Sequence, residues 1–240
     1  MERDFAVPDG LKKWFGDTYL NPLHIARRSL RRALTLATSY VAGTTLDLGC
    51  GGKRYASLFP RVTRYVFLDL PTNSASERMV SVWGDGQALP FRPDAFDSVL
   101  CTEVLEHVPA PEHLFAEVYR VLKQDGHLIL TTPQTWGLHE VPHDYYRYTE
   151  FGLRFLAERA GFTVLVVKPT CGIWATVGQR LSSFVFFELG LPQNIVVRGG
   201  LATACAAGQI AFTGLDALFG HRGDPLDHLL IARKGSTGRA

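Results

Sequence analysis

The sequence has little that would indicate a secreted, metal-bound or nucleic-acid-binding protein. Its 240 residues include four cysteines, which are far apart and form no Cys-x-x-Cys pair. Neither a disulfide framework nor a cysteine zinc site is indicated, and this usage fits a reducing compartment. The first residues lack the basic start and apolar core of a signal peptide, so we expect a cytoplasmic protein. A net charge of +2 is too small to favour nucleic acid as a partner.

Two motifs with a known meaning lack the context that their function requires. The run Arg27-Arg28-Ser29-Leu30-Arg31-Arg32 is similar to a twin-arginine export signal, but only a short apolar stretch separates it from a predicted strand. We therefore expect a surface helix there. Residues 139–143 contain the letters of the zinc-protease motif H-E-x-x-H, which needs both histidines on one helix face. Pro142 disfavours a helix at this place, so no metal site is expected.

A glycine-rich turn follows the strand predicted at residues 45–48. Its sequence, Gly49-Cys50-Gly51-Gly52, allows positive φ and lets a ligand lie against bare backbone. A strand, a Gly-x-Gly turn and the helix expected near residues 53–59 form the nucleotide-binding start of an α/β domain. The loop lacks both the last glycine of a dinucleotide loop and the Ser or Thr of a phosphate-binding loop. A nicotinamide oxidoreductase is therefore disfavoured.

Strands and helices alternate along most of the chain. This rhythm predicts a doubly wound α/β fold, in which a seven-stranded, mostly parallel sheet is covered by helices on both faces. We expect a single domain with an N-terminal helical cap (1–43), a core (44–170), an apolar helical insertion (171–225) and a last strand (226–235). The expected strands are 45–48, 65–68, 80–83, 96–101, 127–132, 162–167 and 228–232, and the expected helices are 23–42, 53–59, 111–122 and 149–160.

Asp69 ends the second predicted strand at the distance from the glycine turn that a ribose-binding acid would have. A carboxylate there can accept two hydrogen bonds from a ribose diol. The alternative is a helix cap or a turn residue, and the spacing favours the ribose role.

Four stretches together resemble the class I S-adenosylmethionine (SAM)-dependent methyltransferases, most closely their small-molecule branch. The resemblance runs from Leu46 to Val167 and implies a Rossmann-like methyltransferase fold with SAM as the cofactor. The stretches are LDLGCGGKRY, VFLDL, GDGQALPFRPDAFDSVLCTEVLEHVPAPEHLFAEVYRVLKQDGHLILTTPQ and HDYYRYTEFGLRFLAERAGF.

The resemblance also implies roles for individual residues. The glycines of the turn would approach the methionine part of SAM, Asp69 would hold the ribose hydroxyls, and Asp85 would bond the adenine amine. One departure is Lys53, which stands where the family often has a third glycine. The implied cofactor-binding residues are Asp47, Gly49, Cys50, Gly51, Asp69, Leu70, Asp85, Gly86, Gln87, Cys101 and Thr102.

Methyl transfer from a sulfonium is a direct displacement, so the protein must mainly align the acceptor and exclude water. A general base is needed only for a weak nucleophile such as a hydroxyl, and histidine titrates near neutral pH. The candidate catalytic residues are His107 and His143, with a local hydrogen-bonding role as the alternative for His107. The expected wall of the acceptor pocket is formed by His139, Tyr145, Tyr146 and Arg147.

Charges are scarce in residues 172–224, where the simple fold needs one helix. Residues 181–187 are apolar and 199–215 are uncharged, but neither segment reaches the ~20 residues of a bilayer span. A helical lid or a dimer surface is the preferred interpretation, and an interfacial patch for a lipid-linked acceptor is the alternative. The expected partners are a small-molecule or lipid-linked acceptor, a membrane surface touched peripherally, and a second copy of the chain.

The function predicted from these observations is methyl transfer from SAM to a small-molecule or lipid-linked acceptor, at oxygen in the first instance. Transfer to nitrogen or carbon remains open. The alternative from another class is a non-catalytic SAM-fold protein that serves as a binding or scaffold subunit.

Overall fold

The computed structural model describes residues 16–51, 55–71, 80–190, 194–220 and 222–235. By its internal contacts the chain divides into two compact units. One, the hairpin unit, comprises Met1–Arg32, Gln134–Asp144 and Pro169–Asp227, and the other, the sheet unit, comprises Ala33–Pro133, Tyr145–Lys168 and His228–Ala240. The expectation of a single domain, with its four segment boundaries, stays a prediction.

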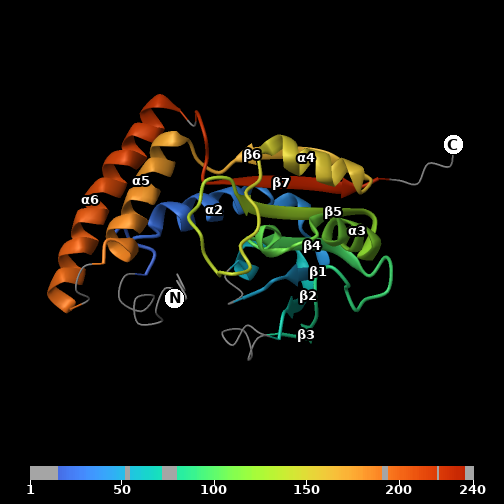
Figure 1. The fold of residues 1–240 in the computed structure, drawn as a ribbon. Coiled ribbons are helices and arrows are strands. Elements are labelled where there is room, and N and C mark those ends of the chain that lie inside the picture. The colour runs from blue at the N-terminus through green and yellow to red at the C-terminus, as the bar shows by residue number, and fades with distance from the viewer. Residues whose placement is uncertain (1–15, 52–54, 72–79, 191–193, 221, 236–240) are drawn as a thin grey trace. The chain divides into compact units, whose positions relative to one another are not determined.

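A seven-stranded sheet in the order β3-β2-β1-β4-β5-β7-β6 confirms the expected fold class (Figure 1). The pairs β1–β2, β1–β4, β2–β3 and β4–β5 are all parallel. The strands are β1 (Gly43–Leu48), β2 (Val62–Asp69), β3 (Val82–Trp83), β4 (Phe96–Thr102), β5 (Leu122–Pro133), β6 (Phe162–Pro169) and β7 (Asp227–Lys234).

The central strands are buried on both faces, as parallel strands usually are. In β4, Val99 and Cys101 join one core cluster, and Leu100, which points to the opposite face, is buried as well. The same cluster contains apolar side chains of α3 (Pro111–Val121) and α4 (Glu150–Arg159). These contacts fix the sheet and leave its strand ends free to carry loops.

The start of α3 and both ends of α4 follow from their sequences. Pro111 is the first residue of α3, where its missing N–H costs no helical hydrogen bond. The Thr149 hydroxyl accepts a hydrogen bond from the Gly152 N–H at 3.2 Å and so caps α4, as expected. Gly161, with φ of +96°, directly follows the end of α4.

Three of the expected helices end or form differently. The helix expected near residues 53–59 is wrong in its described part, which has only a 3-10 turn at Ala56–Leu58; residues 52–54, Lys53 included, lie outside the described residues. Helix α2 (His24–Leu36) stops before residue 42, and a 3-10 turn follows at Thr38–Tyr40. Helix α3 ends at Val121 because β5 begins at the buried Leu122, which pairs with the start of β4.

The insertion is a pair of helices, α5 (Ile173–Ser183) and α6 (Ile195–Phe219), with a π-helical turn at Phe184–Glu188 after α5 (Figure 1). The expectation that no segment reaches bilayer length is wrong. Among the described residues, α6 is long and apolar enough to cross a membrane by length and composition. The sequence reasoning stopped at residues 199 and 215, whereas the helix continues through Arg198 and Asp216 to apolar residues at both ends.

Candidate active site

The carboxyl ends of four parallel strands meet at one edge of the sheet. There β1 leads into Gly49, β2 ends on Asp69, β3 leads into Gly84 and β4 ends on Thr102. In open α/β sheets, ligands bind outside this edge. The cofactor residues implied by the sequence resemblance lie in or directly after these strands.

The turn after β1 needs its glycines for two different reasons. Gly49 has φ of +69°, and a Cβ there would overlap the Val104 side chain. Gly51 has φ of +45°, and apart from its chain neighbours no atom of the described residues lies within 4 Å of the place where its Cβ would be. Gly49 is therefore required by packing, whereas the space beside Gly51 is open to a ligand.

Asp69 ties the turn to the second strand. Its carboxylate accepts hydrogen bonds from the Gly51 N–H at 3.1 Å and from the Leu70 N–H at 2.9 Å, and the residue is buried. Both bonds orient the Asp69 carboxylate beside Gly51. They also make Asp69 a turn residue, which was the alternative interpretation from the sequence. Asp47 is buried in β1 beneath the turn, and Leu70 is exposed.

The segment after β3 forms a compact turn around Asp85. The carboxylate of this exposed residue accepts a hydrogen bond from the Gln87 N–H at 2.9 Å, and the Gln87 side chain accepts one from the Ala110 N–H at 3.3 Å. A Cβ at Gly86 would lie 3.3 Å from the side chains of Leu48 and Leu114. The turn is thus packed against β1 and α3, with the Asp85 carboxylate toward solvent.

At the end of β4, Cys101 and Thr102 are expected to approach the cofactor through their backbone rather than through reactive side chains. Cys101 is completely buried, and burial raises the pKa of its thiol far above the ordinary value. A thiol of this kind is inert.

Two glutamates at the end of β4 were missed by the sequence reasoning. Glu103 has φ of +54°, a strained conformation for a residue with a side chain, and its Oε1 is buried without a hydrogen-bond partner. Burial raises the pKa of Glu103 to about 7, while the hydroxyl of Thr131 and the charge of Arg147 act in the opposite direction. Glu106 is fully buried and accepts a hydrogen bond from the Thr132 hydroxyl at 3.0 Å. The sequence signal that could have identified them is the presence of two acids within four residues at the end of a predicted strand.

The predicted catalytic and acceptor residues fall into two groups. His107 lies in the sheet unit, where its Nε2 is 3.8 Å from Glu106 Oε1. The N–H groups of Tyr145 and Tyr146 donate to the Glu106 carbonyl at 2.9 and 3.3 Å, so this segment runs beside the histidine turn at Leu105–His107. Both tyrosines are exposed, and the Tyr146 hydroxyl donates to the Pro109 carbonyl at 2.9 Å.

His139 and His143 lie in the hairpin unit and are held by contacts within their own loop. The His139 N–H donates to the Asp144 carboxylate at 2.9 Å, and its ring Nδ1 lies 3.3 Å from the same oxygen. The His143 N–H donates to the Glu140 carbonyl at 2.9 Å. The two histidines thus share one loop, and their catalytic and acceptor-binding roles stay predictions.

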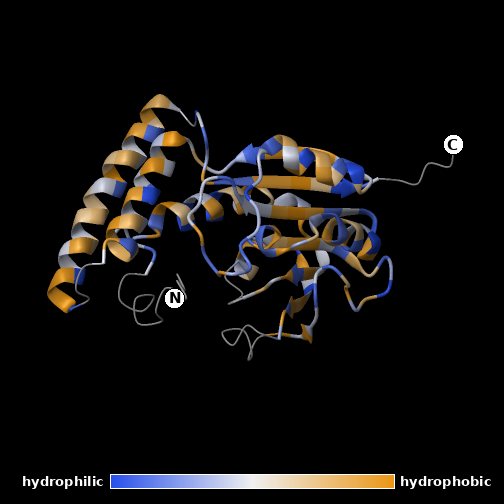
Figure 2. Ribbon diagram, in the orientation of Figure 1, coloured by the Kyte–Doolittle hydropathy of each residue, from blue (hydrophilic) through white to orange (hydrophobic). Residues whose placement is uncertain are grey.

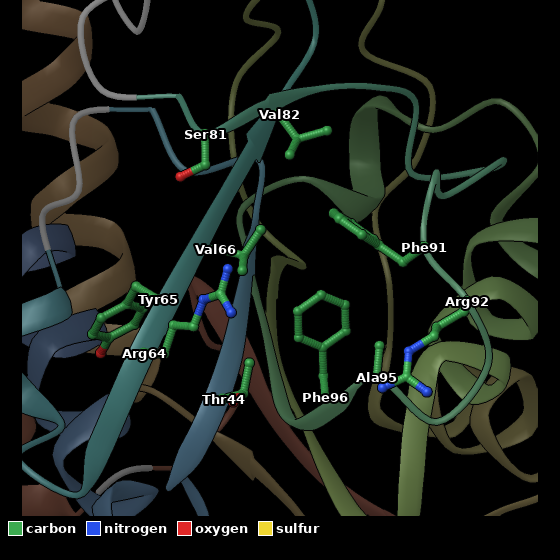
Figure 3. Close-up of a pocket in the computed structure, with 10 residues that line it drawn as sticks. All are labelled: Thr44, Arg64, Tyr65, Val66, Ser81, Val82, Phe91, Arg92, Ala95 and Phe96. Carbon is green, nitrogen blue, oxygen red and sulfur yellow. The ribbon is translucent and has the colours of Figure 1, made fainter.

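A hollow of about 410 Å³ in the sheet unit is a different feature (Figure 3). It is lined by Thr44 at the start of β1, by Val66 and Val82, and by Phe96 at the start of β4. These positions include the amino ends of the strands, and none of the implied cofactor residues lines the hollow. Because the open glycine turn and Asp69 lie at the carboxyl ends, we place the ligand there.

Comparisons with known proteins identify the domain that forms this edge. Residues 46–130 match the model of the family described as "Methyltransferase domain". The ubiquinone biosynthesis O-methyltransferase of Chromobacterium violaceum is 29% identical over 133 residues, which are 50% of this chain and 57% of that protein. Residues 46–130 are a class I methyltransferase domain. The expected family is thereby confirmed, and S-adenosylmethionine is the cofactor of this domain class.

Solved structures agree with the methyltransferase domain in fold alone. Phosphoethanolamine N-methyltransferase 2 of Haemonchus contortus, in complex with S-adenosyl-L-methionine, has a TM-score of 0.56 at 19% identity and covers 85% of this chain and 52% of that chain. The [4+2]-cyclase SpnF has a TM-score of 0.54 at 21% identity and covers 86% of this chain and 81% of that chain. The roles of single residues in the methyltransferase domain stay predictions.

Proposed function

We propose that this protein transfers the methyl group of SAM to an oxygen atom of a small-molecule or lipid-linked acceptor. The observation that carries the proposal is the edge of the sheet unit, where the open turn at Gly51 and the Asp69 carboxylate lie on the same set of strand ends as Glu106 and His107. Curated relatives named ubiquinone biosynthesis O-methyltransferase support oxygen as the acceptor atom.

The chemistry requires few protein groups. The bond between the sulfonium and its methyl carbon breaks as a bond from the acceptor oxygen to that carbon forms, and SAM leaves as its demethylated product. An acceptor hydroxyl must also lose its proton, which we assign to the His107 imidazole. Glu106 Oε1, 3.8 Å from His107 Nε2, is the ion-pair partner of the imidazolium that results. Tyr145 and Tyr146 offer exposed rings beside which an aromatic or apolar acceptor can lie.

The test is transfer of a radiolabelled methyl group from SAM to hydroxylated aromatic acceptors with and without an apolar tail. We expect His107→Ala to lower kcat by about 10² to 10⁴, with the dissociation constant of SAM unchanged, because general-base catalysis contributes that much. The matched control is His113→Ala on the exposed surface of α3, which should retain full turnover. Equal turnover by the two variants would remove His107 from the mechanism.

The alternative function is a SAM-binding protein without transferase activity, since the likeness to a [4+2]-cyclase shows that the fold hosts other chemistry. Calorimetric titration separates the two. SAM binding that Asp69→Asn weakens, together with no methyl transfer to any acceptor of the panel, would favour the alternative. Asp125→Asn, which changes an exposed carboxylate of the same unit, is the control for binding.

A further inference from the structure

The helical pair α5–α6 of the hairpin unit has the polarity of its surfaces reversed. The buried positions of α5 include Thr176, Gln179, Ser182 and Ser183, and those of α6 include Gln209 and Asp216. Figure 2 shows the two helices in mainly hydrophobic and intermediate colours. Apart from glycine, alanine and one threonine, the side chains that α5 and α6 expose are large and apolar. They are Ile173, Trp174, Leu181, Phe184 and Leu189 around α5, and Ile195, Val196, Ile210, Leu218 and Phe219 in α6.

The buried polar side chains are satisfied within the unit. Gln209 accepts from the Ile25 N–H at 3.1 Å and donates to the Tyr19 and Asn21 carbonyls at 3.0 Å each. The Gln179 side chain accepts from the Ala26 N–H at 3.0 Å and donates to the Pro22 carbonyl at 2.8 Å. Asp216 accepts hydrogen bonds from the Gly172 and Ala175 N–H groups at the start of α5, at 3.1 and 3.3 Å. The hydrogen bonds of Gln179, Gln209 and Asp216 thus hold polar side chains inside the unit, beside two small apolar clusters around Phe186 and Ile25.

The polar interior and the apolar outer surface of the α5–α6 pair indicate the environment in which this surface is stable. In water, a helix buries its apolar stripe and exposes its polar one. In a bilayer the reverse arrangement is stable. Apolar side chains contact the lipid tails without cost, whereas polar groups must find hydrogen-bond partners inside the protein. Helix α6 is long and apolar enough to cross a membrane, and only 22% of its most apolar 18 residues are buried, whereas the core helix of a water-soluble fold is mostly buried.

We infer that the α5–α6 pair embeds its outer surface in a lipid bilayer. Charge fits this occupant, since residues 173–222 contain three arginines, Arg180, Arg198 and Arg222, against two acids, Glu188 and the buried Asp216. A membrane with anionic head groups would attract this excess of positive charge. The inference does not depend on methyl transfer and stands on the hairpin unit alone.

The pair lies in the plane of the membrane and does not cross it. With 25 residues α6 is roughly 37 Å long, which would suffice to cross a hydrocarbon core of about 30 Å. However, the start of α2 is bonded to the middle of both helices through Gln179 and Gln209, and Arg27 and Arg28 follow at once. A crossing orientation would bring these arginines to the centre of the bilayer, where charge is expensive. An in-plane orientation keeps α2 on the aqueous side.

Flotation of the full chain with phosphatidylcholine vesicles, with and without 30% phosphatidylglycerol, tests the inference. We expect the protein to float with the vesicles and to stay bound in 1 M salt, because apolar contacts are not screened. The double variant Leu181→Lys/Ile210→Lys changes two exposed side chains and should lower the bound fraction at least tenfold. The matched control Phe151→Lys/Phe155→Lys makes the same kind of change on the exposed side of α4 in the sheet unit and should float normally.

Helix content by circular dichroism and a thermal unfolding transition like those of the native chain show that the Lys variants fold. Failure of the protein to float with any vesicle would overturn the inference. So would flotation that 1 M salt abolishes and that Leu181→Lys/Ile210→Lys does not affect. A stable dimer in detergent-free buffer that shields the α5–α6 pair from vesicles would overturn it as well.

Two further measurements address depth and orientation. Brominated lipid should quench the fluorescence of Trp174, and Trp174→Phe should lose that quenching. All four native cysteines are free and buried, so Glu188→Cys supplies an exposed thiol at a charged position of the π-helical turn, outside the apolar surface. A membrane-impermeant maleimide should label it on protein added to sealed vesicles. Protection of this thiol would indicate a crossing orientation and overturn the in-plane assignment.

Discussion

At the scale of single residues, the two glycines of the turn after β1 differ in what their missing Cβ allows. Gly49 faces the Val104 side chain, whereas Gly51 faces open space and donates its N–H to Asp69. Gly49 is therefore required by the packing of the protein, and Gly51 by a ligand that lies against its backbone. The Gly-x-Gly pattern in the sequence shows both residues but does not separate these roles.

Replacing each glycine by alanine should separate them. Gly51→Ala is expected to fold, with a cost of about 1–2 kcal/mol for positive φ, and to weaken SAM binding at least tenfold because its Cβ enters the ligand space. Gly49→Ala should lose more stability, since strain adds to overlap with Val104. Urea unfolding and calorimetric titration of both variants give the comparison. Normal SAM affinity in Gly51→Ala would contradict a ligand beside this residue.

Glu103 makes the stability of the sheet unit depend on pH. Burial raises its pKa from the ordinary 4.5 to about 7. Between these two pH values the folded state keeps a proton that the unfolded state has lost, so stability falls as pH rises through this window and is constant above it. At 1.36 kcal/mol per pH unit, the loss is about 3 kcal/mol at most.

The variant Glu103→Gln removes this titration. It should be more stable than the native chain by about 1–3 kcal/mol at pH 8 and nearly equal to it at pH 4.5. Urea unfolding at intervals from pH 4.5 to 8.5 measures the difference between the two. A difference that stays constant across the series would show that Glu103 is already ionised in the folded protein at the acidic end.

At the scale of secondary structure elements, local signals account for where helices start better than for where they end. Thr149 caps α4 and Pro111 opens α3, both as expected. The end of α2, by contrast, lies at Leu36, whereas the helix was expected to continue to residue 42. Ala37 and Val41 continue the helical spacing of apolar residues past this end, so periodicity alone does not locate it.

The cap of α4 can be tested directly. Thr149→Ala should lower the free energy of unfolding by about 1 kcal/mol, because the Gly152 N–H loses its acceptor. For a chain of this size the melting temperature should fall by about 2–4 °C, as measured by circular dichroism. Thr149→Ser retains the hydroxyl and should restore most of the loss. Equal destabilisation by both substitutions would assign the effect to the lost methyl group.

At the scale of the whole molecule, a cofactor that binds only the folded protein must raise its stability. SAM at about 100 times its dissociation constant should add roughly 2.7 kcal/mol and raise the melting temperature by about 5–10 °C. Thermal unfolding of the full chain with increasing SAM measures this, and Asp69→Asn should shift the response to higher concentration. An unchanged melting temperature at millimolar SAM would contradict cofactor binding by the isolated chain.

The fold and the cofactor edge were largely predictable, and the acceptor side was not. The alternation of strands and helices, the glycine turn and Asp69 follow from short, contiguous patterns, because a parallel strand is a run of apolar residues and its ligand turn comes directly after it. The order of the strands in the sheet was not predicted. The positive φ and buried acid of Glu103 and the burial of Glu106 depend on β5, which supplies Thr131 and Thr132. No pattern near residues 103–106 contains that information.

The sequence by itself determined the α/β class and the methyltransferase domain, and it predicts the edge of the sheet at which the cofactor binds. Each of these is written in neighbouring residues, where backbone freedom and apolar periodicity act over short distances. Only the tertiary structure decided which face of α6 is buried. Burial there depends on hydrogen bonds from Gln209 to residues at the other end of the chain, and these place the polar side chains inside and the apolar ones outside.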